Sequence, residues 1–144
     1  MPSDLASANA NRAYSMAGTS IAIFTFMLVF LYPRFESGQL DSLLFQSALV
    51  VMGLATFASV VASFHYYGAA LEARLDEPTR AMLGRRGDLF WFVGYSLLFL
   101  APCLVLFGIG LVVVGGVWLA LWIGYMVFAL VNFPRVVTRR KPRS

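Results

Sequence analysis

The sequence predicts an all-α membrane protein, with a single domain over residues 1–144 that crosses the bilayer four times in two antiparallel hairpins. Hydrophobic residues make up 60% of the chain and charged residues only 12%, and the mean hydropathy is +0.77. This composition lies far outside the range of soluble globular domains. The apolar residues also form four runs, each close to the roughly 20 residues that a helix needs to cross a hydrocarbon core.

The first two spans are expected at about residues 13–32 and 42–67. The first ends at Pro33, which cannot continue the hydrogen-bond ladder, and Arg34, which must reach the headgroups. No small-residue cleavage pattern follows the run, so we expect a retained helix and not a signal peptide. The link at residues 33–41 is short and polar and contains a Ser-Gly turn. It therefore predicts that the second helix is an antiparallel neighbour of the first.

The longest charged connection lies between the second and third spans. Asp76 and Glu77 precede Pro78, an arrangement typical of a helix start with proline in the first turn. The glycines at Gly84 and Gly87 then predict a break in the chain. We therefore expect a short, separate cytoplasmic helix in this loop.

The third and fourth spans are expected at about residues 88–108 and 112–133, joined by a glycine-rich turn. Pro102 lies inside the third span, where it predicts a kink and a carbonyl group that needs a partner from a neighbouring helix. On the fourth span, three aromatic residues are spaced i, i+4 and i+7, which favours packing against a neighbouring helix or lipid. They are Trp118, Trp122 and Tyr125.

Basic residues predict the orientation. Ten of the eleven Lys and Arg residues lie in the N-terminal segment, the middle loop or the C-terminal tail at 135–144, and only Arg34 lies in another loop. Under the positive-inside rule both termini are then cytoplasmic. The short loops and the strong asymmetry favour a bacterial inner membrane. The basic tail is expected to contact anionic lipid headgroups. Its residues are Arg135, Arg139, Arg140, Lys141 and Arg143.

The interiors of the four predicted spans carry no Asp, Glu, Lys, Arg or His. Proton relays, coupled transport and voltage sensing use such residues, so none of these activities is expected. The single His65 and the single Cys103 lie too far apart to form a ligand set, so we expect no metal, no other cofactor and no enzyme activity. The basic residues are not interleaved with aromatic residues, so nucleic-acid binding is not expected either.

Polar and small residues recur along the second span at spacings of three, four and seven, which places them near one face. They are Gln46, Gly53, Thr56, Ser59, Ser63, Tyr66 and Tyr67. Thr19 and Thr25 on the first span belong to a similar small-residue face. The pattern is compatible with the lining of a pore and also with close helix packing.

His65 and Glu72 lie where the second span leaves the membrane, and together they form a candidate pH-sensitive gate. The alternative is an interfacial belt of Tyr rings with the imidazole in water.

The function predicted first is a homo-oligomeric channel for ions or small solutes, lined by the polar face of the second span. The alternative is a non-catalytic structural or assembly subunit of a larger membrane complex. The expected partners are the lipid bilayer, further copies of the chain and, in the second case, another membrane protein.

Overall fold

A computed structural model describes the backbone of residues 2–71 and 76–138 and the side chains of residues 5–70 and 76–131. Within these residues every regular element is helical. The elements, in order, are α1 (Pro2–Phe26), the π-helical turn η1 (Met27–Leu31), α2 (Tyr32–Glu36), α3 (Ser42–Leu71), α4 (Glu77–Gly108) and α5 (Val112–Thr138).

Four stretches of the described chain are long and apolar enough to cross a bilayer. Their mean hydropathies lie between 1.8 and 2.2. The predicted all-helical class and the four membrane-length helices are thereby confirmed. The stretches are Leu5–Glu36, Ser42–Ala70, Glu77–Gly108 and Val112–Val131.

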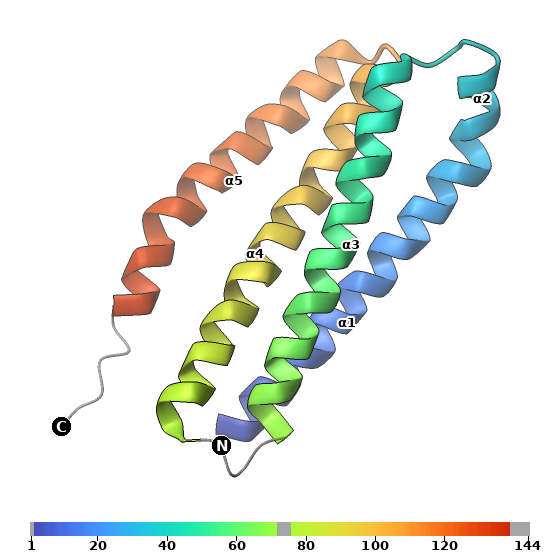
Figure 1. The fold of residues 1–144 in the computed structure, drawn as a ribbon. Helices are drawn as coiled ribbons and strands as arrows, with labels where there is room; N and C mark the ends of the chain where they lie inside the picture. Colours follow the sequence, from blue (N-terminus) through green and yellow to red (C-terminus); the bar gives the residue numbers. More distant parts are fainter. Residues whose placement is uncertain (1, 72–75, 139–144) are drawn as a thin grey trace.

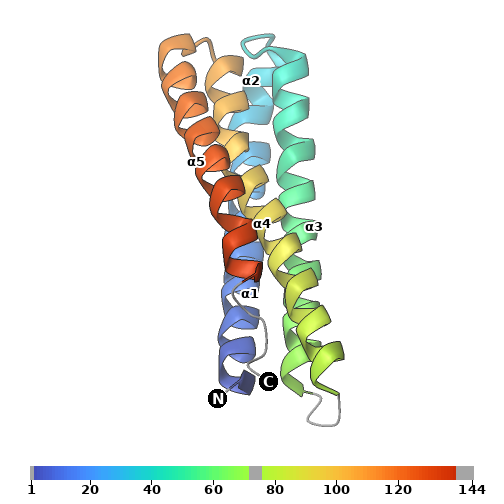
Figure 2. The ribbon, with the colours of Figure 1, turned by 90° about the vertical axis from the view of Figure 1, so that its left-hand side faces the viewer.

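Each long helix lies beside the next one in the chain, and successive long helices run in opposite directions (Figure 1). α3 packs most extensively against α4 and next against α1, whereas α5 packs mainly against α4. In the upper part of Figure 2, α4 lies between α5 and α3. α5 leans away from the other helices toward its C-terminal end (Figure 1). The packed core of the molecule is therefore formed by α1, α3 and α4.

The first membrane helix is longer at both ends than the predicted residues 13–32. Three alanines at positions 6, 8 and 10 favour helix in the polar segment, and α1 begins at Pro2. Pro33 does not end the helix, because it lies in the first turn of α2, where its missing N–H group is not needed. The chain turns only after Glu36, at Gly38, which has a φ of +74° that glycine adopts without strain.

The predicted short, separate helix between the second and third spans is not present, because its residues form the first turns of α4. Asp76 occupies the N-cap position and Pro78 lies in the first turn, as the sequence predicts. The predicted break at Gly84 and Gly87 is wrong, since the helix continues through both. Gly87 instead allows close packing: a Cβ atom there would lie 2.8 Å from Cε1 of Tyr66 on α3.

The turn after α4 lies at the same end of the bundle as the turn after α2 (Figure 1). Gly110 has a φ of +82°, and the next residue, Leu111, donates its N–H to the carbonyl of Leu106 at 2.9 Å. This bond closes the helix end in the manner of a Schellman motif. The Asp41 N–H donates to the carbonyl of Gly108 at 3.1 Å and joins the two turns.

Small side chains line the contacts of α3. Ala48, Ala55 and Ala62 are fully buried. At the contact with α4, a Cβ atom on Gly94 would lie 2.9 Å from the Ser59 hydroxyl oxygen and 3.1 Å from the Ala55 carbonyl oxygen. Lipid tails are as apolar as leucine, so such close steric packing is a main source of helix association in a bilayer.

Candidate functional site

The polar face predicted on the second span is divided between the inside and the outside of the bundle. Ser59 and Ser63 are fully buried on α3. Their hydroxyls donate at 2.7 Å to the carbonyls of Ala55 and Val60 on the same helix. Ser59 lies against Gly94 of α4. Both hydroxyls are therefore satisfied within α3, at positions enclosed by the packed bundle.

The other members of this face lie nearer the surface. Thr56 is half-buried and donates its hydroxyl to the carbonyl of Met52 at 2.9 Å. Gln46 is exposed and donates to the Ser42 hydroxyl at 3.2 Å, and Gly53 is also exposed. Tyr67 is half exposed, at 50%. Within one chain these residues do not line a common path with Ser59.

The two threonines predicted on the first span are exposed on α1. Thr19 donates its hydroxyl to the carbonyl of Ser15 at 3.0 Å. Ser20, which the sequence did not single out, is fully buried and donates to the carbonyl of Met16 at 2.9 Å. The hydroxyl of α1 that faces the bundle is thus Ser20 and not Thr25.

His65 is half-buried near the C-terminal end of α3. Its Nδ1 lies 2.8 Å from the carbonyl oxygen of Val61, and its ring stacks on Phe90 of α4 with centroids 5.4 Å apart. The proposed partner of His65 in a gate, Glu72, lies outside the described residues. So do Arg139, Arg140, Lys141 and Arg143, and of Arg135 only the backbone is described.

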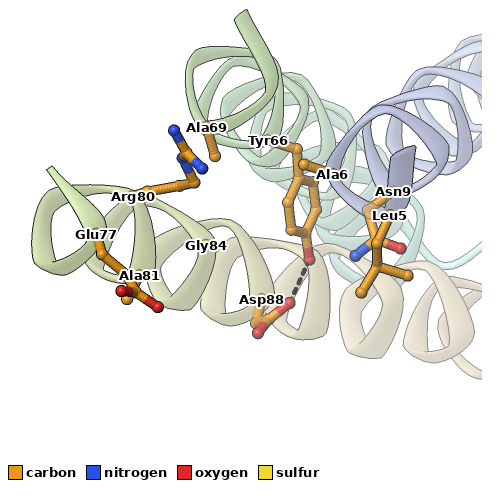
Figure 3. Close-up of a pocket in the computed structure, with 10 residues that line it drawn as sticks. All are labelled: Leu5, Ala6, Asn9, Tyr66, Ala69, Glu77, Arg80, Ala81, Gly84 and Asp88. Atoms are coloured by element: carbon orange, nitrogen blue, oxygen red, sulfur yellow. Dashed lines mark hydrogen bonds between the residues drawn. The ribbon is translucent and has the colours of Figure 1, made fainter. Parts of the chain in front are cut away.

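A polar site among the described side chains lies at the same end of α3, next to the start of α4. Tyr66 is only 5% exposed, and its hydroxyl donates to Oδ1 of Asp88 on α4 at 2.7 Å. This bond borders a cavity of about 440 Å³ formed by the beginning of α1, the end of α3 and the beginning of α4 (Figure 3). The polar side chains that line it are Asn9, Tyr66, Glu77, Arg80 and Asp88.

Two further hollows continue from this outer cavity along α1 and α4. A middle cavity of about 160 Å³ is also lined by Asn9, Tyr66 and Asp88, and it adds Arg12 and Trp91. An open groove of about 300 Å³ begins at Arg12 and Trp91. It extends past Ser15, Met16, Thr19, Tyr95 and Leu98.

Of the residues that line these cavities, the sequence indicated Tyr66 and Thr19 as candidate site residues. It did not indicate that four others lie together, which are Asn9, Arg12, Trp91 and Asp88. They come from helices that are far apart in the chain, and α1 and α4 make little direct contact. One available signal was that Arg12 and Asp88 are the last charged residues before the first and third apolar runs. That signal places both at the same level of a bilayer but does not place them on facing helices.

Aromatic residues connect α5 to α4. The indole N–H of Trp118 donates to the carbonyl of Phe99 at 3.1 Å, and that of Trp122 donates to the carbonyl of Ser96 at 2.8 Å. The rings of Tyr95 and Tyr125 have centroids 5.8 Å apart. The aromatic stripe of the fourth span thus packs against a neighbouring helix, which is one of the two interpretations that its spacing favours.

The described residues offer little for metal or covalent chemistry. No group of three or more His, Cys, Asp or Glu side chains in the described ranges is close enough to hold a metal ion. Cys103 is a buried free thiol within α4. Comparison of the chain with protein-family models, curated proteins and solved structures finds no match.

Proposed function

We propose that the protein is a non-catalytic structural or assembly subunit of the membrane, and that it acts through contacts between its helices and those of further copies. The observation that carries this proposal is the location of Ser59 and Ser63. Both are fully buried, and their hydroxyls are satisfied by carbonyls of α3 itself. They form a packing contact of the kind that small residues make between membrane helices, and not a surface available to a permeating solute.

α3 is also a poor wall for a pore within one chain. It is the most enclosed of the four spans, with 39% of its most apolar stretch buried, against 6% for α5. The residues exposed on its outer surface are mainly large and apolar, as in Leu43, Val50 and Phe57. A water-filled path requires polar groups on the exposed side, so this surface suits contact with lipid or with another helix.

α5 supplies the surface on which we place the contact between copies. Gly116, Ala120 and Gly124 are exposed and recur every four residues. No atom lies within 4 Å of the position that a Cβ atom would take on either glycine. Small residues at this spacing allow two membrane helices to approach closely. We place α5 of a second copy against this face.

The membrane topology belongs to the same proposal. The four helices form two antiparallel hairpins with both termini in the cytoplasm, because ten of the eleven basic residues then lie on that side. The membrane is a bacterial inner membrane. Cysteine labelling from outside intact cells tests the orientation: Gln39→Cys is expected to react and Ser7→Cys is expected to be protected. The reverse pattern would refute it.

The assembly is tested by measuring the mass of the purified chain in lipid nanodiscs. We expect a dimer for the unaltered chain and a monomer for Gly116→Leu combined with Gly124→Leu. Val114→Leu, at an exposed site on the same helix outside the small-residue face, is the matched control and should remain dimeric. A monomer in every case, or a dimer that survives the double substitution, would contradict the proposed contact.

The homo-oligomeric channel remains a second candidate. It is favoured by Gln46 and Gly53, which are exposed on the outside of α3, where several copies together can surround a path. Flux of K⁺, Na⁺, Cl⁻ and a neutral solute from liposomes separates the two functions. The assembly proposal expects no flux. Flux that disappears in Gln46→Leu, while the oligomer persists, would establish the channel instead.

A further inference from the structure

Three cavities follow one another along α1 and α4, from the polar end of the bundle to its apolar middle, and this series is called the path below. The outer and middle cavities share Asn9, Tyr66 and Asp88. The middle cavity and the open groove share Arg12 and Trp91. The outer cavity and the groove, of about 440 and 300 Å³, are within the size range of small-molecule sites, and the middle cavity of about 160 Å³ is smaller.

The path crosses the level at which both helices change from polar to apolar. On α1 the last charged residue is Arg12, and on α4 it is Asp88. Both line the middle cavity, so this cavity lies at the membrane interface. Trp91 is one turn further along α4, at the depth where tryptophan is enriched in membrane proteins. The outer cavity then lies at headgroup level or beyond, and the open groove faces the hydrocarbon.

The order of charges along the path matches that of an amphipathic lipid. Thr19, Tyr95 and Leu98 line the groove at the apolar end. Arg12 follows, at the junction between the groove and the middle cavity. The Asp88 carboxylate lies at the next junction, between the middle and outer cavities. From the hydrocarbon outward the path therefore presents an apolar groove, a cation and then an anion.

We propose that this path binds one glycerophospholipid with a primary-amine headgroup, such as phosphatidylethanolamine. An acyl chain lies in the groove, the phosphate pairs with Arg12, and the ammonium group donates to Asp88. Ion pairs and charge-assisted hydrogen bonds of this kind are stronger than neutral ones. The Tyr66 hydroxyl holds Oδ1 of Asp88 at 2.7 Å, so the carboxylate is positioned before the lipid arrives.

The other charged residues of the outer cavity agree with this placement. Arg80 lines the cavity, but its guanidinium points toward Ala69 and away from Asp88 (Figure 3). Glu77, at the outer end of the same cavity, adds a second carboxylate near the aqueous phase. The carboxylates favour an ammonium headgroup over an uncharged glycerol headgroup.

The test is native mass spectrometry of the full chain in detergent, titrated separately with phosphatidylethanolamine, phosphatidylcholine and phosphatidylglycerol that carry the same acyl chains. We expect one phosphatidylethanolamine per chain, bound about tenfold more tightly than either other lipid. The trimethylated headgroup of phosphatidylcholine cannot donate a hydrogen bond to Asp88, and phosphatidylglycerol has no cation. Equal binding of the three lipids, or a preference for phosphatidylglycerol, would overturn the proposal.

Variants separate the three parts of the site. Arg12→Gln should weaken phosphatidylethanolamine binding by about tenfold, while Arg85→Gln, an exposed arginine that lines none of these cavities, should not. Asp88→Asn keeps an oxygen that accepts from Tyr66 and should remove only the preference for the amine headgroup. Thr19→Trp should fill the groove and reduce binding, unlike Ile21→Trp on the same helix. Equal effects in each variant and its control would refute the assigned site.

Discussion

Replacing Gly94 with alanine tests whether the contact between α3 and α4 holds the bundle together. The new Cβ atom would lie 2.9 Å from the Ser59 hydroxyl oxygen, 3.1 Å from the Ala55 carbonyl oxygen and 3.3 Å from the Ser59 amide nitrogen. Two of these neighbours are backbone atoms, so the helices must move apart. Overpacking of this kind costs about 1–3 kcal/mol, whereas alanine gains about 0.5–1 kcal/mol over glycine in helix propensity. We expect a net loss of about 1–2 kcal/mol in the free energy of unfolding.

The assay is equilibrium unfolding of the purified chain in mixed micelles, with thermal denaturation as a second measurement. Gly53→Ala is the matched control, because it lies on α3 and no atom is within 4 Å of its Cβ position. We expect this control to be as stable as the unaltered chain or slightly more stable. The reasoning fails if Gly94→Ala unfolds at the same denaturant concentration as Gly53→Ala, since the close approach of the two helices would then contribute nothing.

Three further substitutions test single contacts by the same unfolding assay. Tyr66→Phe removes the donor to Asp88 and should lower the free energy of unfolding by about 1–3 kcal/mol, whereas Tyr67→Phe, at an exposed ring, should leave it unchanged. Trp122→Phe removes one indole bond between α5 and α4 and should cost about 0.6 kcal/mol; a loss of several kcal/mol would mean that α5 is a larger part of the core than its exposure indicates. Gly110→Ala, at a φ of +82°, should cost about 1–2 kcal/mol, and no change would argue against the left-handed turn.

The predicted spans agree with the structure at three helix ends, which are the start of α3 at Ser42, the end of α4 at Gly108 and the start of α5 at Val112. The start of α4 follows from Asp76 and Pro78, and the turn after it contains Gly110, as expected for a glycine-rich link. Two of the boundary predictions that are wrong involve the same residue types in other roles. Pro33 lies in the first turn of a helix that continues through it, and Gly87 packs against Tyr66 inside a helix. A proline in the first turn of a helix, or a glycine at a close contact between helices, does not end the helix.

Predictions of the candidate sites were less accurate than those of the helices, because they depend on which helix faces meet. The sequence placed Ser59 and Gln46 on one polar face, yet the first is fully buried and the second is exposed. The residues around the outer and middle cavities come from α1, α3 and α4, and no spacing within any one helix indicates that Arg12 and Asp88 line the same hollow.

The sequence by itself determined that the chain is helical and that four of its helices are long and apolar enough to cross a membrane. These properties depend on the length and hydropathy of single segments, because every membrane helix must satisfy its own backbone hydrogen bonds. Only the tertiary structure decided which faces of the helices meet. Lipid is as apolar as the bundle interior, so hydrophobic periodicity does not distinguish a packed face from a lipid face. Steric fit at residues such as Gly94 and Gly87 makes that choice.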